Sequence, residues 1–274
     1  MTGPSPAPAP APAPVPVSIL PTDAPPDRPA RKVAGTKVDL QITEDHHLCP
    51  GCGHPVAWRL LLEVIAELDL AGRSIGVVGH GCYTNIVSIA DVEFLQCLHG
   101  RAPAVATGVK RVHPHTAVFT LQGDGDMASE GLQEVLHAAA RGEKLTCIML
   151  NNGVFGDTGG QMTAATVVGQ RTKTSLDGRE PEAHGYPVPV AELVSHVPGT
   201  AYVARGAVNN AGSIAKTKRY LRKAFELQMA GAGFTFVEVL TMCPTGWFVP
   251  TSGGPTYMVD TFEKTFPPGE LTPS

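Results

Sequence analysis

Residues 145–150, Leu-Thr-Cys-Ile-Met-Leu, are apolar almost throughout and are followed directly by Asn151-Asn152. An apolar run without polar alternation is typical of a strand that is buried on both faces, as in a parallel sheet covered by helices. Other strand-length apolar runs lie at 74–78, 117–122, 201–205 and 235–240. Segments with a helical pattern alternate with them, at 56–70, 129–141, 190–197 and 212–229. We therefore predict an α/β fold with an open, mostly parallel sheet and helices on both faces.

The amino-terminal part of the chain differs in composition from the rest. Pro and Ala dominate residues 1–35, and such a stretch offers few main-chain donors and little large apolar surface to bury. We predict a disordered tail there and a folded domain over residues 36–274. Because 43% of the 274 residues are hydrophobic, that domain can bury a substantial single core.

Charge and hydropathy exclude several classes of function. The formal net charge is −4, so the chain lacks the basic field that gathers nucleic acid phosphates. Its apolar runs are far shorter than the roughly 20 residues of a membrane-spanning helix, and no secretory signal pattern is present. We expect a cytoplasmic protein that binds neither nucleic acid nor membranes, with six cysteines kept reduced for metals or catalysis.

Polar motifs follow two of the predicted strands, at the sheet edge where ligands of such folds bind. Gly123-Asp-Gly-Asp126 follows strand 117–122, and Asn151-Asn152 follows strand 145–150. Magnesium prefers hard oxygen ligands, so the Asp124 carboxylate, the Asn152 carboxamide and the Val154 carbonyl would suit a magnesium diphosphate. Either motif alone is common in turns. Together, one helix and one strand apart, they resemble the thiamine diphosphate signature.

Four of the cysteines stand where metal ligands would converge. Cys49 and Cys52 form a Cys-x-x-Cys pair before the first helix, and Cys82 and Cys243 follow strands. Four thiolates can hold a cubane iron–sulfur cluster. Zinc is an alternative, with His46, His47 and His54 as further ligands, and a redox dithiol is the least favoured reading because no strand precedes the pair. The other two cysteines have apolar neighbours and are predicted to be core residues, namely Cys97 and Cys147.

Over residues 40–250 the chain resembles the thiamine diphosphate-binding β subunit of the 2-oxoacid:ferredoxin oxidoreductases. Separate blocks carry the resemblance: Cys49-Pro-Gly-Cys-Gly-His54, Gly79-His-Gly-Cys82, His99-Gly-Arg-Ala102 with Thr107-Gly-Val-Lys110, Gly123-Asp-Gly125, Asn151-Asn152 and Thr158-Gly-Gly-Gln161. The resemblance implies a thiamine diphosphate-binding fold of the pyrophosphate type with an iron–sulfur site.

The resemblance also assigns cofactor residues. A [4Fe-4S] cluster would be held by Cys49, Cys52, Cys82 and Cys243, and magnesium by Asp124, Asn152 and the Val154 carbonyl. Thiamine diphosphate would be lined by His80, Gly81, Cys82, Tyr83, Gly123, Gly125, Asp126, Gly156 and Asp157. Two positions depart from the family pattern: Tyr83 stands where a small Ser or Thr is usual, and Asp157 where Asn or Met is usual.

The activity implied is oxidative decarboxylation of a 2-oxoacid to acyl-coenzyme A and carbon dioxide, with electrons passed to ferredoxin. Over residues 153–179 the chain looks closer to the 2-oxoglutarate and branched-chain members of the family than to the pyruvate ones. The resemblance therefore favours 2-oxoglutarate, with a branched-chain acid such as 2-oxoisovalerate as the alternative. Glu130 and Glu134 are predicted to be surface charges. The resemblance implies that the catalytic glutamate comes from a partner α subunit; γ and δ subunits complete the implied partners. Two other classes stay open: a non-catalytic metal-binding relative, and a self-sufficient thiamine-dependent decarboxylase, for which the chain is short.

Overall fold

A seven-stranded sheet forms the centre of the domain in this computed structural model, which describes residues 43–271. The predicted tail at 1–35 lies outside the described residues. The strand order is β2-β1-β3-β4-β8-β7-β9, and all neighbours pair in parallel except β7 and β9. The strands are β1 (Ser74–Val78), β2 (Glu93–Gln96), β3 (Ala117–Gly123), β4 (Thr146–Asn151), β7 (Thr200–Ala207), β8 (Phe234–Leu240) and β9 (Gly269–Leu271).

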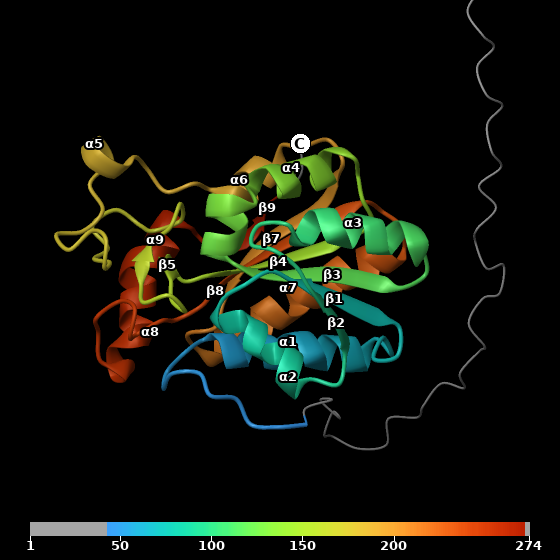
Figure 1. The fold of residues 1–274 in the computed structure, drawn as a ribbon, viewed down its shortest axis with the longest axis horizontal. Helices are drawn as coiled ribbons and strands as arrows, with labels where there is room; N and C mark the ends of the chain where they lie inside the picture. Colours follow the sequence, from blue (N-terminus) through green and yellow to red (C-terminus); the bar gives the residue numbers. More distant parts are fainter. Residues whose placement is uncertain (1–42, 272–274) are drawn as a thin grey trace, which may run out of the picture. The chain divides into compact units, whose positions relative to one another are not determined.

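Helices cover both faces of this sheet, as the apolar strands predict (Figure 1). On one face α1 (His54–Glu67) and α7 (Ala211–Met229) bury their apolar sides against the sheet. The opposite face is covered by α3 (Ala102–Val112), α4 (Leu132–Ala140) and α6 (Val190–Ser195). Every residue of β8 is buried, which fits a strand with helices above and below it. The predicted α/β architecture is therefore confirmed.

The elements missed by sequence patterns are mostly those without a buried apolar run. Strand β2 lies at the sheet edge with mostly exposed side chains, and β9 has only three residues. Helix α3 is missed as well. Residues 153–186, for which the sequence patterns predict neither strand nor helix, contain a short hairpin and one helical turn: β5 (Val154–Phe155), β6 (Gln161–Met162) and α5 (Pro181–His184). The helix predicted at 129–141 begins later, because a π-helical turn over Gly125–Glu130 precedes it.

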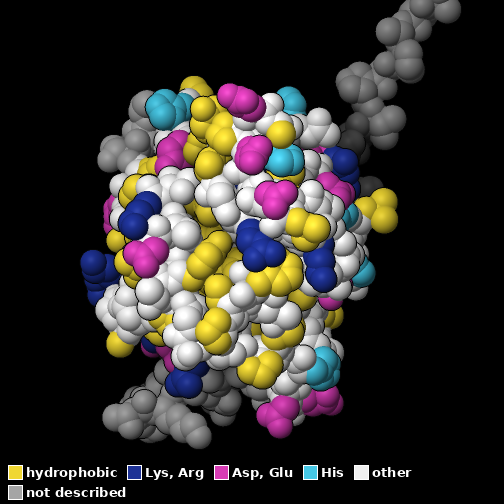
Figure 2. All heavy atoms as spheres, turned by 90° about the vertical axis from the view of Figure 1, so that its left-hand side faces the viewer, with side chains coloured by type: hydrophobic (Ala, Val, Ile, Leu, Met, Phe, Trp, Pro, Cys, Tyr) yellow, Lys and Arg dark blue, Asp and Glu magenta, His cyan; other side chains and the backbone are white. Residues whose placement is uncertain are grey.

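The carboxyl ends of the strands lead into loops and short helices that build one side of the domain. Two of these are α8 (Gly254–Tyr257) and α9 (Glu263–Thr265), which lie near β5 on the left of Figure 1. Figure 2 looks directly onto this side. Short α2 (Ile86–Ile89) continues a turn that begins at Cys82. No described helix combines the length and the apolar character needed to cross a bilayer.

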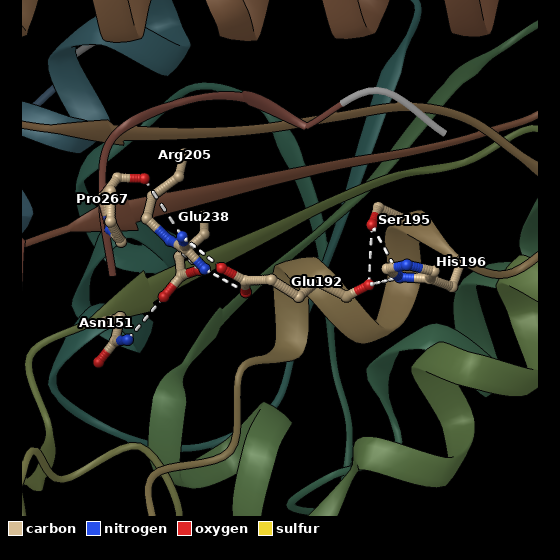
Figure 3. A network of polar contacts seen from close by, with 7 residues as sticks. All are labelled: Asn151, Glu192, Ser195, His196, Arg205, Glu238 and Pro267. Atoms are coloured by element: carbon tan, nitrogen blue, oxygen red, sulfur yellow. Dashed lines mark hydrogen bonds and ion pairs between the residues drawn. The ribbon is translucent and has the colours of Figure 1, made fainter. Parts of the chain in front are cut away.

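A buried ion network crosses the sheet beneath the Asn-Asn motif (Figure 3). Arg205 of β7 and Glu238 of β8 are each 1% exposed, and the Arg205 Nε lies 2.7 Å from the Glu238 carboxylate. Arg205 also donates both terminal nitrogens to Glu192 of α6, at 2.8 and 2.6 Å. The other Glu238 oxygen accepts from the Asn151 amide at 2.7 Å. Asn151 in turn accepts from the Gly153 N–H, so the network reaches the loop after β4.

Candidate active site

A cavity of about 450 Å³ opens at the carboxyl ends of β1, β3 and β4. It gathers every residue that the sequence predicts for thiamine diphosphate and magnesium. These are His80, Gly81, Cys82, Tyr83, Gly123, Asp124, Gly125, Asp126, Asn152, Val154, Gly156 and Asp157. They come from segments far apart in the chain, and their assigned roles stay predictions.

The carboxylate of Asp124 lies buried at the base of this cavity. One oxygen accepts from the Asn152 N–H at 3.1 Å, and the other accepts from the Thr163 hydroxyl at 2.5 Å. Burial raises the pKa of Asp124 to about 7, and the Glu238 charge adds to this shift. A carboxylate that burial penalises in this way is suited to hold a divalent cation, whose charge would compensate it.

Asn152 is held on three sides. Its side-chain oxygen accepts from the Val154 N–H at 3.1 Å, and its main-chain oxygen accepts from the Trp247 indole at 2.7 Å. Its amide nitrogen lies 3.4 Å from the His54 Nε2. Burial lowers the pKa of His54 to about 4, so the imidazole is neutral and accepts this hydrogen bond. The carboxamide oxygen keeps a free lone pair beside Asp124, as a magnesium ligand requires.

The contacts of Gly125 and Tyr83 explain why these residue types stand at these two positions. A Cβ on Gly125 would overlap the ring of Phe155, so the glycine allows close packing. The Tyr83 hydroxyl and the Gly100 N–H both donate to the Asp126 carboxylate. This contact explains the departure at position 83, because a serine could not reach across to Asp126. Asp126 thus lines the cavity while its carboxylate is occupied within the protein.

Sequence reasoning missed several residues of this cavity. Its lining also includes His54, Cys97, Leu98, His99, Phe155 and Thr158. Cys97 is only half-buried, so its prediction as a core residue is wrong in part, whereas Cys147 is fully buried as predicted. Thr163, the hydroxyl donor to Asp124, carries no spacing signal because it lies 39 residues further along the chain.

The two glutamates of the following helical segment do not reach the cavity. Glu130 is exposed and pairs with His99 at 2.9 Å, as expected for a surface charge. Glu134 pairs with Arg101 and its side chain is only 11% exposed, so its prediction as a surface charge is wrong. Among the described residues that line the cavity, no glutamate is present.

A second cavity, of about 360 Å³, adjoins the first and is lined by all four predicted cluster cysteines, Cys49, Cys52, Cys82 and Cys243. Four residues form a wall common to the two cavities: His54, Cys82, Asn152 and Gly156. We call these four residues the shared wall.

Main-chain contacts bring the distant cysteines together. The Gly53 N–H donates to the Met242 carbonyl at 2.9 Å, which joins the Cys-x-x-Cys turn to the end of β8. A Cβ on Gly53 would lie 2.6 Å from the Met242 nitrogen, so only glycine permits this approach. A Cβ on Gly156 would lie 3.4 Å from the Cys82 sulfur and 3.9 Å from the Cys243 sulfur. The sulfurs therefore face one space.

Burial in this cavity favours the protonated form of three of the thiols, those of Cys52, Cys82 and Cys243. Burial raises the pKa of Cys52 to about 11, and those of Cys82 and Cys243 to about 12. Main-chain N–H groups of His54 and Gly246 oppose this shift at Cys52 and Cys243. Such N–H···S contacts are also what tunes cysteine-bound clusters.

Within residues 43–271, no three His, Cys, Asp or Glu side chains converge closely enough to hold one metal ion. In a cubane cluster each thiolate binds a different iron, so the cysteines surround a space and do not meet at a point. The cysteine-lined cavity is compatible with this arrangement, and both the cluster and the zinc alternative stay predictions.

The loop that carries Thr163 is held by one arginine. Arg179 is 5% exposed and its guanidinium donates to six main-chain carbonyls, those of Thr163, Ala164, Thr166, His184, Gly185 and Tyr186. Gln170 and Thr166 both donate to the Gly153 carbonyl, at 3.1 and 2.6 Å. The side chains of Thr166, Gln170 and Arg179 therefore fix the loop beside Asp124.

Replacing Arg179 with Met is expected to lower stability by about 3 kcal/mol, because buried carbonyls lose charged donors. The loop should also become cleavable by protease at lower enzyme concentrations than in the wild type. Urea unfolding and limited proteolysis measure the two effects. Arg59→Met is the matched control, since Arg59 is 65% exposed in an i,i+4 pair with Glu63. Equal cleavage of the two variants would contradict the role given to Arg179.

Comparison with known proteins places this geometry in a family. Residues 81–239 match the model of the thiamine pyrophosphate enzyme, C-terminal TPP binding domain. The chain is 40% identical over 221 residues to ketoisovalerate oxidoreductase subunit VorA of Methanothermobacter marburgensis, covering 81% of this chain and 46% of the relative. It is 34% identical over 197 residues to 2-oxoglutarate synthase subunit KorB of Archaeoglobus fulgidus, covering 72% of this chain and 69% of the relative. The chain thus spans about half the length of the VorA relatives that it matches.

A solved structure agrees with these sequence matches. It is the 2-oxoglutarate:ferredoxin oxidoreductase from Magnetococcus marinus with 2-oxoglutarate, coenzyme A and succinyl-CoA bound. The identity is 28% and the TM-score 0.64, over 76% of this chain and 67% of that one. On the matched domain, the KorB identity and the shared architecture, the chain belongs to the thiamine pyrophosphate-binding β-type subunits of the 2-oxoacid:ferredoxin oxidoreductase family.

Proposed function

We propose that this chain is the β subunit of an enzyme that oxidatively decarboxylates a 2-oxoacid to acyl-coenzyme A, with ferredoxin as electron acceptor. One observation carries the proposal: a cavity built from the Gly-Asp-Gly and Asn-Asn motifs shares a wall with a cavity lined by four cysteines. The first suits an organic cofactor held by a metal, and the second suits a redox centre. Their adjacency supports decarboxylation coupled to electron transfer.

In the first cavity, Asp124, Asn152 and the Val154 carbonyl would hold magnesium, and the remaining predicted residues would line thiamine diphosphate. When bound, thiamine diphosphate supplies a ring that accepts the electrons released as carbon dioxide leaves. The protein orients this ring and excludes water. Phe155 packs on Gly125 at one side of the cavity, and the Thr163 hydroxyl and the Asn152 N–H hold the Asp124 carboxylate in place.

In the second cavity, Cys49, Cys52, Cys82 and Cys243 would hold a [4Fe-4S] cluster. Because three of these thiols have a raised pKa, cluster binding would release protons as each thiolate forms. Cys82 belongs to the shared wall, so an electron leaving the first cavity has a short path. The reducing cytoplasm, which we propose as the location, would keep these thiols free for iron.

The catalytic glutamate would come from an α subunit that closes the first cavity. Leu98 lines that cavity yet is 81% exposed, and such a residue at a cavity rim suits a surface that a partner covers. We propose that coenzyme A, and γ and δ subunits where present, join through this partner. The chain alone should then be inactive.

The substrate is either 2-oxoglutarate or a branched acid such as 2-oxoisovalerate. The solved relative binds 2-oxoglutarate, which supports the first. Two observations support the second: the 40% identity to the VorA subunit, and a lining that joins Leu98, Val154 and Phe155 with three aspartates. An apolar side chain suits this lining, whereas a second carboxylate would need a cation from the partner.

The test is to purify the complex of this chain with its α subunit without oxygen and to supply each 2-oxoacid with coenzyme A and methyl viologen. We expect a brown complex that releases thiamine diphosphate on denaturation and reduces the dye, with the chain alone inactive. Stoichiometric zinc without iron would favour the non-catalytic alternative. Activity of the chain alone would favour a self-sufficient decarboxylase, and pyruvate as the best substrate would contradict both preferred acids.

A further inference from the structure

We propose that the surface around Phe248 is the docking site of the acceptor, a small acidic iron–sulfur protein. We call Phe248, Arg171 and Lys173 the Phe248 patch. The proposal rests on the proposed function, since it requires a cluster in the cysteine-lined cavity. It adds the surface through which electrons leave the molecule.

The Phe248 patch lies at the opening of the cysteine-lined cavity. Phe248 and Lys173 both line that cavity, together with Cys49, which is exposed to solvent. Among the residues that line this cavity, Lys173 is the only lysine, arginine, aspartate or glutamate. An acceptor seated on this opening would therefore approach the cluster at its exposed ligand, and would meet a positive charge.

The backbone presents the Phe248 ring outward. Its φ is 56°, a left-handed conformation that bulky residues rarely adopt, and its side chain is 47% exposed. The turn is fixed on both sides, because the Trp247 N–H donates to the Cys243 carbonyl at 2.9 Å and the Val249 N–H donates to the Pro244 carbonyl at 3.1 Å. Strained residues of this kind gather at functional sites. In this turn Trp247 lies in the core and Phe248 lies at the surface, in the lining of the same cavity as Cys243, a predicted cluster ligand.

Two cations flank the ring without a carboxylate partner among residues 43–271. The Arg171 guanidinium lies 5.8 Å from the ring centroid and the Lys173 ammonium 5.7 Å from it. Arg171 donates to the Leu176 carbonyl at 2.8 Å, and neither cation forms a salt bridge with a described residue. On this side of the molecule Lys and Arg side chains lie among apolar ones (Figure 2).

Charge complementarity selects an acidic partner. The chain as a whole has a formal charge of −4, so two cations without a described carboxylate partner make the Phe248 patch a favourable place for a negative protein to bind. The aromatic ring would supply the apolar centre of a small, transient interface. In the transfer itself, one electron would pass from a cluster held by the four cysteines to the cluster of the acceptor, with no bond formed and no proton moved.

The test uses the complex with its α subunit and three variants: Arg171→Glu/Lys173→Glu, Phe248→Gly, and Lys216→Glu as an exposed control on α7. Phe248→Gly removes the ring and relieves the left-handed backbone, so folding is retained. Binding of an oxidised, net-negative bacterial ferredoxin is measured by calorimetry at two salt concentrations. Dye and ferredoxin reduction are then measured with the preferred 2-oxoacid.

We expect the charge-reversal variant to bind ferredoxin at least tenfold more weakly, with less dependence on salt, and Phe248→Gly to raise the KM for ferredoxin at least threefold. Methyl viologen reduction by the Lys216→Glu control should stay within twofold of the wild type. Ferredoxin affinities equal to that of Lys216→Glu would overturn the proposal. Loss of the α subunit from the variants would also overturn it, because the patch would then belong to the subunit interface. A wild-type complex that reduces no viologen would contradict the proposed function. In that case the ferredoxin affinities of the variants would still test whether the Phe248 patch is the docking site.

Discussion

Replacing Asp124 with Asn is expected to weaken binding of magnesium thiamine diphosphate by roughly 100-fold or more, since even groups that only support a metal ligand contribute up to that factor. The same change should make the cofactor-free chain more stable at pH 8. The buried carboxylate has hydrogen bonds from Thr163 and Asn152 but forms no ion pair with a residue of 43–271, so its charge costs free energy in the folded state. An amide has nearly the same shape and no charge.

The pH dependence of this effect follows from the direction of the shift. Burial raises the pKa of Asp124 from 3.8 to about 7, so between these values the folded chain holds a proton that the unfolded chain has released. The contribution of Asp124 to the stability of the cofactor-free chain is therefore fully present below about pH 4 and falls as pH rises to about 7, by a total of about 4 kcal/mol. The Asp124→Asn variant should lack this fall.

Urea unfolding at pH 5 and pH 8 without magnesium checks this prediction, and calorimetry with magnesium and thiamine diphosphate checks the loss of binding. Asp177→Asn is the matched control, because Asp177 is exposed. If the Asp124→Asn variant were less stable than the wild type at pH 8, the carboxylate would have a compensating partner and the magnesium site would be misplaced. If the Asp124→Asn variant bound magnesium thiamine diphosphate as tightly as the wild type, the magnesium site would likewise be misplaced.

The second large effect is expected at Arg205, the cation of the network in Figure 3. Arg205→Met should lower the free energy of unfolding by about 3–5 kcal/mol, because the fully buried Glu238 would lose its only described cation. The double variant Arg205→Met/Glu238→Gln should recover much of this loss. In the single variant, thiamine diphosphate should also bind more weakly, since Asn151 is held by Glu238 and holds Gly153.

Urea unfolding of both variants, at neutral pH, measures these energies. Arg222→Met serves as the control, because Arg222 is 41% exposed in its contacts with Glu67 and Glu226, and exposed pairs contribute under about 1 kcal/mol. A loss at Arg205 no larger than at Arg222 would show that Glu238 does not need the pair. No recovery in the double variant would show that Arg205 acts through packing, for example on Phe266.

Sequence patterns predict the parts of this protein that hydrophobic burial decides. Strands such as β4 and β8 are buried on both faces, so their apolar runs are continuous and easy to recognise. The candidate site residues follow from the same pattern, because Asp124 and Asn152 stand directly at the ends of two such strands. Cys82 and Cys243 come after strand ends as well, and main-chain pairing alone brings these positions to one edge.

Residues placed by loop conformation could not be predicted in this way. Thr163 reaches Asp124 only because Arg179 folds the intervening loop through main-chain carbonyls, which leave no periodic signal. Phe155 enters the cavity through the short β5–β6 hairpin, and Cys97 through an edge strand with exposed side chains. His54 is visible in the sequence, because it stands in the Cys49–His54 motif. Its hydrogen bond with Asn152, however, joins residues 98 positions apart and is seen only in the structure.

The position of β8 has a consequence for how the protein is made. This strand lies between β4 and β7 inside the sheet, yet it follows both of them in the chain, and Cys243 comes after it. During synthesis, Cys49, Cys52 and Cys82 leave the ribosome long before the residues that complete their cavity. If these thiols hold a cluster as proposed, all four could enclose it only once Met242 has met Gly53 and Trp247 has met Asn152. Cofactor loading would then be a late event of biogenesis, and a chain that stalls before residue 243 would leave three thiols open to oxidation.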